Sequence, residues 1–573
     1  MEETPLAPDR PGTRQRKWGI EQIVAAGAIA SLIILVVLPL ASLLWGSVTV
    51  EGRFSFANFS RAFSERLFYQ ALLNSLILGA WTGLLSIVIG LPMAWAVSRT
   101  DLPAKGFVRM TANIAYITPP FLSAIAFVNL FSPNAGLINR FFRDVMGLPF
   151  LTFNIFSMRG MVLVTVLHTF PFVFLLASSA LESVDASLEE SAQILGASRW
   201  RTAVRIAAPL VAPSVLSGAL LAFVNAIALF GSQAIIGLPG RVFTLPTRIY
   251  SLFDYPPQYG LASALSLIFV AITVLALWVQ RSYLAKRSYV TLAGKGVRPQ
   301  LIALGGSRWI ILAFCIAVFL VAVVAPYLSL LAVSLSKSWG LQFWQNLTLA
   351  NYKFILFKYD VTQRAILNSM VLATAAATIA VLLGAIISWV DLRTNVRGRR
   401  LLDYTSLIPL GLPGIVVAVA LLQFWLRMPV PIYGTLTIIL LAYVSRFIPL
   451  GVRAASAALR QVDPALEEAA RIGGAGWLRT MRKVTLPLIR PGLFAGWLLV
   501  FVPAIQELSA SILLFTSDSM TLAVAVYNLY ESGYREAVAA LAILNMLIIS
   551  VAIWVATRLG GRGMTGQRPE VTS

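Results

Sequence analysis

The chain has 573 residues, of which 58% are hydrophobic and only 12% are charged. Soluble proteins carry roughly 25% charged residues, so this composition excludes a soluble globular fold and indicates a membrane protein. The formal net charge of +21 then has two interpretations, which are binding to nucleic acid and basic loops on the cytoplasmic side of a membrane.

Apolar runs long enough to cross a hydrocarbon core of about 30 Å predict twelve membrane spans, six in each half of the chain. The expected fold class is therefore an all-α membrane protein. The spans of the first half are expected at about 20–46, 71–97, 108–131, 159–181, 211–236 and 261–283, and those of the second at about 308–335, 366–392, 404–427, 432–456, 490–515 and 538–559.

Basic residues before the first span, from Arg10 to Lys17, place the N-terminus in the cytoplasm. With this orientation most lysines and arginines fall in cytoplasmic loops and both termini are cytoplasmic. The basic clusters lack the interleaved aromatic residues that stack on bases, which argues against nucleic acid. The first apolar run is too long for a cleaved signal peptide and lacks a cleavage site, so it is expected to remain as a helix.

The predicted organisation follows from these spans and from one polar, glycine-bearing stretch between the halves. It comprises a cytoplasmic tail at 1–19, a first half at 20–283, a linker at 284–307, a second half at 308–559 and a tail at 560–573.

Several kinds of chemistry are absent from the sequence. Cys315 and His168 are the single cysteine and the single histidine, so a disulfide framework and a Cys/His zinc site are excluded, and no metal site is expected. No Gly-x-x-x-x-Gly-Lys-[Ser/Thr] loop occurs, so the chain does not hydrolyse ATP by itself. We expect no catalytic residues, no cofactor in this chain, and no outer loop large enough to capture a solute.

A short internal repeat lies between spans four and five of each half. Residues 188–197 are echoed at 466–475, and the match continues to Pro209-Leu210 and Pro487-Leu488. Apolar residues at helical spacing predict a short amphipathic cytoplasmic helix. Its start is signalled by Ser187 with Glu190 in the first copy and by Asp463-Pro464 in the second. Gly196 and Gly474 are expected to end the helix in the left-handed conformation, before a second, basic helix.

The pattern Glu-Glu-[Ser/Ala]-Ala-x-x-x-Gly-Ala followed by Pro-Leu resembles the EAA loop of permeases from binding-protein-dependent type I ABC importers. We call residues 188–197 and 466–475 the first and second EAA segments. The resemblance implies two permease halves fused in tandem in the bacterial inner membrane, two copies of a partner ATPase that binds ATP, and a periplasmic solute-binding protein. It assigns ATPase coupling to Glu189, Glu190, Ala192, Gly196, Glu467, Glu468, Ala470 and Gly474. An interfacial helix lying on lipid head groups is the alternative.

Ionisable groups inside spans are candidates for the transport pathway, because they are costly in a bilayer. His168 and Arg446 are equivalent in the repeat, each three residues before a proline. They are expected either to pair across the pseudo-twofold axis or to bind carbonyl groups that the prolines free. Asn74 and Asn368 open the second and eighth spans, where hydrogen bonds between helices are expected.

The stretch Gln506-Glu507-Leu508-Ser509-Ala510 resembles iron(III)-type permeases of this family. Glu507 is expected either to attract a cationic solute in the pathway or to pair with an arginine. Residues 244–250 and 520–527 also recur and are expected to be outer loops that re-enter the membrane.

The expected function is import of a solute, with ferric iron favoured. Thiamine, aminoethylphosphonate and polyamines remain alternatives, because permeases for these solutes resemble the same branch. Two alternatives from other classes are an ion-coupled secondary transporter, which predicts paired acids buried within spans, and a membrane scaffold, which has no use for two EAA segments.

Overall fold

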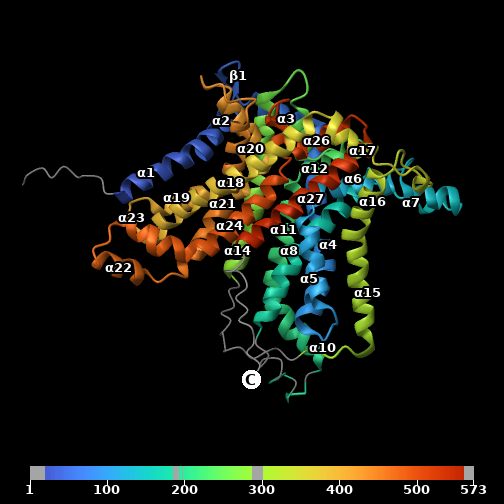
Figure 1. Ribbon diagram of the computed structural model, residues 1–573, viewed down its shortest axis with the longest axis horizontal. Coiled ribbons are helices and arrows are strands. Elements are labelled where there is room, and N and C mark those ends of the chain that lie inside the picture. Colours follow the sequence, from blue (N-terminus) through green and yellow to red (C-terminus); the bar gives the residue numbers. More distant parts are fainter. Residues whose placement is uncertain (1–19, 185–190, 193, 197, 287–300, 561–573) are drawn as a thin grey trace, which may run out of the picture.

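The computed structural model describes residues 20–184, 191–192, 194–196, 198–286 and 301–560. These residues are almost entirely helical (Figure 1). The strands among them are β1 (Thr49–Val50) and β2 (Arg53–Phe54), which pair as a small antiparallel hairpin. The structure therefore confirms the all-α class expected from the apolar composition.

The helices of the first half begin with the element that follows the N-terminal tail and end before the linker. They are α1 (Ile20–Leu32), η1 (Ile33–Val37), α2 (Leu38–Ser47), α3 (Ala57–Ser64), α4 (Arg66–Arg99), α5 (Lys105–Ile117), α6 (Pro120–Phe131), α7 (Leu137–Arg140), η2 (Phe141–Val145), η3 (Pro149–Leu151), α8 (Met158–Ser183), α10 (Arg199–Thr202), η4 (Ala203–Ala207), α11 (Ala208–Ala228), α12 (Gly231–Gly237), α13 (Leu245–Ser251) and α14 (Tyr259–Lys286).

The second half repeats this order. Its helices are η5 (Gly305–Ser307), α15 (Arg308–Phe319), η6 (Leu320–Val324), α16 (Ala325–Ser334), η7 (Phe343–Asn346), α17 (Ala350–Lys353), η8 (Phe354–Lys358), α18 (Val361–Arg393), α19 (Arg399–Leu407), η9 (Ile408–Gly411), α20 (Gly414–Trp425), α21 (Leu436–Arg460), α22 (Pro464–Ile472), α23 (Trp477–Thr480), η10 (Met481–Thr485), α24 (Leu486–Ile505), α25 (Ser511–Leu514), α26 (Leu522–Glu531) and α27 (Arg535–Gly560).

Within the described residues, ten helical stretches are long and apolar enough to cross a membrane, or up to twelve if each of two bent pairs forms one span. The bent pairs are α5 with α6, at 97°, and α19–η9 with α20, at 112°. They occupy the expected third and ninth spans, which are thus broken rather than straight. Pro119 and Pro413 directly precede α6 and α20, and a proline disfavours helical backbone at the residue before it.

The expected fifth and eleventh spans also end earlier than the hydropathy indicates. The helix α11 stops at Ala228 and α24 stops at Ile505, and the apolar residues that follow form the short, buried helices α12 and α25. An apolar run therefore continues past the end of each spanning helix, because these residues are buried in protein rather than exposed to lipid.

Each half is built around three helices that pack closely together, α4, α8 and α11 in the first half and α18, α21 and α24 in the second. The two sets diverge in Figure 1, where the second set runs toward α22 and α23 and the first set runs downward to α10. Basic residues occur at both of these ends, which the positive-inside rule predicts to be cytoplasmic.

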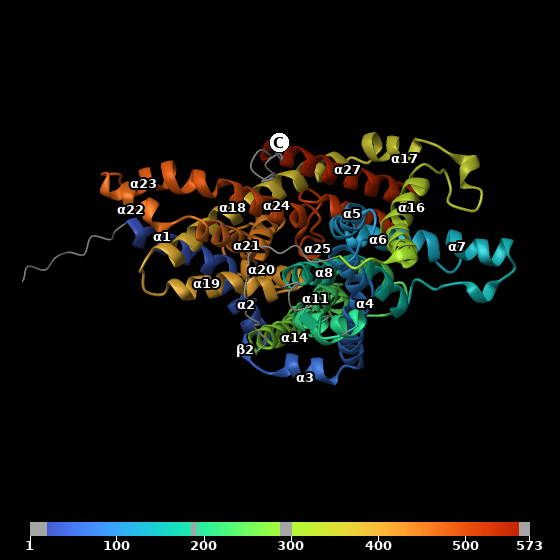
Figure 2. The ribbon, with the colours of Figure 1, turned by 90° about the horizontal axis from the view of Figure 1, so that it is seen from below.

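The first span of each half packs against the other half. The helices α1 and α2 contact α18, α19 and α20, while α16 contacts α6 of the first half, and the same neighbours are seen in both ribbon views (Figures 1 and 2). The two halves thus exchange contacts through their first spans, although α2 also packs on α14 and α16 on α27 of their own halves. The predicted domain boundaries remain a prediction.

Candidate functional site

The second EAA segment forms the helix, glycine turn and helix that the sequence predicts. Asp463 accepts a hydrogen bond from the backbone N–H of Ala465 at 2.9 Å and caps α22. Pro464 occupies the first helical position. The helix ends at Ile472, Gly474 adopts a left-handed φ of +81°, and α23 begins at Trp477. The capping residues and the glycine thus shape a protrusion at the end of α21.

The two acidic residues of this segment have different environments. Glu468 is exposed and Ala470 is half-buried, whereas the Glu467 side chain is only 5% exposed and its Oε1 lies 3.5 Å from Nε of Arg393. Glu468 is therefore available to a partner protein, while Glu467 is directed into the permease. Coupling roles for both residues remain a prediction.

The first EAA segment is described only in part, since Glu189, Glu190 and the capping residue Ser187 lie outside the described residues. Ala192 is half-buried, and Gly196 is exposed with a φ of +86°, as at the equivalent Gly474. The same turn therefore forms in both halves.

Both EAA segments also present large apolar side chains to the outside. Ile194 and Leu195 are 86% and 88% exposed, and Ile472 is 88% exposed. Exposed apolar side chains on a short protruding element are typical of a surface that another protein or a membrane surface covers.

A cavity of about 520 Å³ lies where the two halves meet, and all four predicted pathway residues line it. Its other polar or bend-forming residues include Tyr116, Asn225, Pro120 and Ser509. His168 and Arg446 each lie about ten residues, or about 15 Å, from the N-terminal ends of α8 and α21, close to the middle of these helices. The cavity therefore lies near the middle of the membrane.

Arg446 and Glu507 form an ion pair in the wall of this cavity. Nη1 of Arg446 lies 2.8 Å from Oε1 of Glu507, which also accepts a hydrogen bond from the N–H of Ala510 at 2.8 Å. The side chains are 22% and 6% exposed. Of the two alternatives for Glu507, the structure shows the pairing with an arginine, while the attraction of a cationic solute remains a prediction.

His168 also lines the cavity and is stacked on Tyr116, with ring centroids 6.2 Å apart. The structure shows no hydrogen bond between His168 and Arg446, which binds Glu507 within its own half. The cavity is therefore lined by an ion pair from the second half and an imidazole from the first.

The helix bends bring backbone into the cavity wall. Gln506 donates from Nε2 to the carbonyl of Ile117, the last residue of α5, at 2.9 Å and so joins the two halves. In the second half, Gly414 begins α20 beside the guanidinium. A Cβ at this position would lie 1.5 Å from Nη1 of Arg446. Glycine at the bend thus makes room for the ion pair.

Asn74 and Asn368 have the same role in the two halves, but they bind loops rather than other helices. Asn74 Nδ2 donates to the carbonyl of Phe243 at 2.8 Å, and Asn368 Nδ2 donates to the carbonyls of Asp518 and Met520 at 3.0 Å. These carbonyls lie just before α13 and α26. The expectation of helix-to-helix bonding was therefore wrong, and the repeated Asn instead holds the outer segments that also recur.

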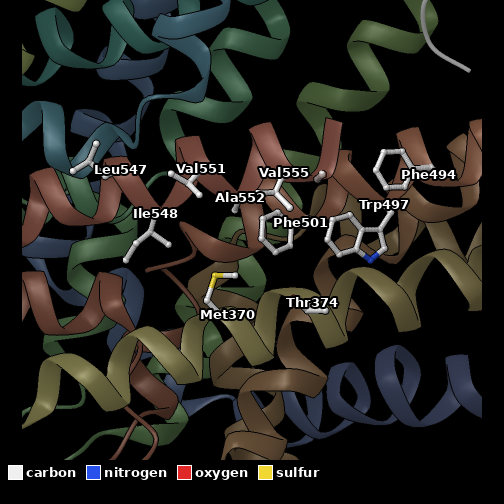
Figure 3. A pocket seen from close by; sticks show the side chains of 11 residues that line it. Met370, Thr374, Phe494, Trp497, Phe501, Leu547, Ile548, Val551, Ala552 and Val555 are labelled. Atoms are coloured by element: carbon white, nitrogen blue, oxygen red, sulfur yellow. The ribbon is translucent and has the colours of Figure 1, made fainter. Parts of the chain in front are cut away.

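A second pocket, of about 700 Å³, lies between α18, α24 and α27 (Figure 3). It is lined by Phe494, Phe501, Leu547, Val551 and other apolar side chains. The indole Nε1 of Trp497, which also lines the pocket, donates a hydrogen bond to Oγ1 of Thr378 at 3.1 Å. This pocket offers a polar solute little, so the cavity between the halves is the better candidate pathway.

Comparison with known proteins identifies the family. The model of the family described as the binding-protein-dependent transport system inner membrane component matches twice, at residues 86–288 and 380–562. The chain belongs to this family of permeases. It is thus a multi-pass transport permease of the inner membrane rather than an enzyme, with the permease domain repeated in tandem.

Relatives of this permease include ferric and molybdenum transport permeases. It is 27% identical to the ferric transport system permease protein FbpB of Actinobacillus pleuropneumoniae, over 92% of this chain and 77% of the relative. It is 28% identical to a putative FbpB of Haemophilus influenzae, over 82% and 73%. The molybdenum transport system permease protein ModB of Escherichia coli is 31% identical over 37% of this chain and 91% of its own length.

Sequence reasoning on this permease missed how its sites are held. The ion pair between Arg446 and Glu507 joins residues 61 positions apart, and Gly414 drew no attention as one glycine in an apolar run. The signal that was available is the repeat itself. Its offset aligns Glu507 with Leu229 and Arg446 with His168, so the second half gains an acid and a permanent cation together.

Proposed function

We propose that this permease forms the transmembrane pathway of an importer for ferric iron, which a periplasmic binding protein delivers and which ATPase subunits drive by binding the two EAA segments. The observation that carries the proposal is the EAA segment repeated in both halves, with the same left-handed glycine turn at Gly196 and Gly474, in a chain whose halves share a cavity. The iron assignment rests on the two FbpB relatives, which match over most of the chain.

The mechanism requires two packings of the same helices rather than a catalytic group. ATP closes the partner ATPase dimer and draws the EAA segments together, and the halves then open the cavity toward the periplasm. The divergence of the two helix sets toward α22 and α10 (Figure 1) fits the state before this closure. We propose two ATPase copies, one for each EAA segment, and cytoplasmic termini.

The cavity chemistry favours passage over tight capture. Among the described residues, no group of three or more His, Cys, Asp and Glu side chains could hold a metal ion. Glu507 is already neutralised by Arg446. A ferric ion therefore meets polar groups in the cavity without a ligand set that would retain it.

An ion-coupled secondary transporter remains the rival from another class. It requires buried acids free to exchange protons or sodium. The buried carboxylates among the described residues are Glu467 and Glu507, and each lies beside an arginine. Their pairing disfavours a proton relay.

Uptake into proteoliposomes tests the function. The tagged permease is purified with the ATPase and binding protein that accompany it, and radioactive ferric iron is supplied on the binding protein. We expect iron to accumulate only when the binding protein is present and ATP is supplied on the side of the membrane that carries the ATPase. Accumulation driven by a proton gradient without the ATPase would contradict the proposal.

The solute is tested separately in the same vesicles. Iron is replaced in turn by thiamine, aminoethylphosphonate, a polyamine and molybdate. For each compound we measure uptake and the affinity for the purified binding protein. ATP-dependent uptake of one of these, with none of iron, would retain the importer and overturn the iron assignment.

A further inference from the structure

Arg393, the last residue of α18, is directed into the base of the second EAA segment. Its side chain is only 10% exposed. Nη2 donates to the carbonyls of Leu459 and Val462, at the end of α21 and in the turn after it. The guanidinium thus binds the backbone from which the EAA helix projects.

The same arginine also contacts the EAA helix itself through Glu467. Nε of Arg393 lies 3.5 Å from Oε1 of Glu467. The carboxylate in turn accepts a hydrogen bond from Oγ1 of Thr485 at 3.0 Å, in the helix that leads to α24. One acidic side chain therefore connects three elements, which are α18, α22 and η10.

Aromatic packing supports the same junction. Trp389, one turn before Arg393 on α18, is 3% exposed. Its ring meets that of Trp477, the first residue of α23, edge to face at 5.4 Å. The end of α18 thus contacts both helices of the protrusion.

An equivalent arginine lies in the first half. Arg99 ends α4, is 2% exposed, and donates from Nη2 to the carbonyl of Val184 at 3.1 Å. Val184 corresponds to Val462 in the repeat. The arginine-to-carbonyl contact at the base of the EAA segment therefore occurs in both halves.

A buried charge is costly unless it is paired, and a buried ion pair is seldom the most stable way to fill a site. Here the pair connects α22, the helix that the partner ATPase is proposed to move, to α18, which packs against α21. Without the pair, the EAA helix would depend on its chain connections to α21 and α24 and on the packing of Trp389 against Trp477.

We propose that Arg393 and Glu467 form a latch that makes α18 move together with the second EAA segment. This inference rests on the proposed function. Both are positioning residues, because they transmit the movement of the EAA helix to the spans and do not bind solute or ATP.

The test compares Arg393→Gln, Glu467→Gln and Arg397→Gln in the reconstituted complex of permease, ATPase and binding protein. Arg397 is a matched control, since it is an exposed arginine just beyond the end of α18. ATP hydrolysis and solute uptake are measured on the same vesicles. If coupling is worth 1 to 2 kcal/mol, the solute imported per ATP should fall about five- to thirtyfold in the latch variants and stay unchanged in Arg397→Gln.

The Glu467→Gln variant keeps both arginine-to-carbonyl bonds, so it carries the test if Arg393→Gln fails to insert. A proportional fall of hydrolysis and uptake, or no change in either, would overturn the latch. If the unaltered complex shows no ATP-dependent uptake, the proposed function fails instead, and the ratio of solute to ATP distinguishes the two cases.

Discussion

Arg446 is an arginine near the middle of a membrane, where an unpaired charge is costly. Its cost is offset by Glu507, and the pair lies in the wall of a cavity that both halves line. The equivalent residues in the first half are His168 and Leu229, so the second half contributes to the cavity wall an ion pair that the first half lacks.

Glu507→Gln should reduce both stability and uptake. The amide retains an acceptor for Ala510 but leaves Arg446 without a counter-charge, which is expected to cost about 3 kcal/mol. Asp518→Asn is the control, because its carboxylate is 90% exposed and its pairing with Arg364 is worth at most about 1 kcal/mol. Uptake in vesicles and thermal unfolding of the purified permease measure the difference. Equal effects of the two substitutions would remove the pathway role of Glu507.

Gly414→Ala should have the same consequence by a different route. The added methyl group would lie 1.5 Å from Nη1 of Arg446, so the guanidinium must shift, and we expect its pairing with Glu507 to weaken. We expect reduced uptake with normal membrane insertion. Gly476→Ala is the control, since a Cβ there meets nothing within 4 Å. Wild-type uptake by Gly414→Ala would show that the pair can be displaced without loss.

At the residue scale, the sequence indicated which ionisable groups matter but not their partners. Ionisable residues are rare within membrane spans because they are costly there, and this indicated His168, Arg446 and Glu507. The contacts depend on helix bends at Pro119 and Pro413 and on the room left by Gly414, and hydropathy carries no information on either.

At the scale of elements, the EAA segments were predictable because their signals are local. Asp463-Pro464 fixes the start of α22 and Gly474 fixes its end, within one short stretch of chain. The bent pairs were not predicted, since each half of a bent pair is as apolar as a straight span. The latch joins α18 to α22 across 74 positions, which only the folded chain brings together.

Gly196→Val and Gly474→Val should impair uptake while the permease still inserts. Both glycines have φ above +80°, and open space surrounds them. The penalty is therefore purely one of backbone strain, about 1 to 2 kcal/mol for a residue with a side chain. Gly476→Val is the matched control, because its φ of −67° suits valine. Uptake relative to the amount of inserted protein is the measurement, and unchanged uptake in both variants would refute the role of the turn.

At the scale of the whole molecule, the exchange of first spans could not be read from the sequence. The first and seventh apolar runs look like the others, and helices in lipid associate through shape and a few polar contacts rather than through hydropathy. Here Ser445 Oγ donates to the carbonyl of Leu35 at 2.9 Å, and Ser329 Oγ donates to the carbonyl of Ala126 at 3.1 Å. Each contact joins one half to the first span of the other.

The exchange predicts that the two halves will assemble even when they are separate chains. We expect residues 1–292 and 293–573, expressed together as two chains, to co-purify and to import solute. The helices α1 and α2 of the first chain would still contact the second chain, and α16 of the second would still contact the first. The control is the same pair with residues 1–47 deleted, which removes Leu35 and the buried face formed by Ala25, Ala28 and Leu32. Co-purification should then weaken and transport should be lost. If the intact fragments separate in mild detergent, or if the deletion changes nothing, the first spans do not hold the halves together, and the linker must do so instead.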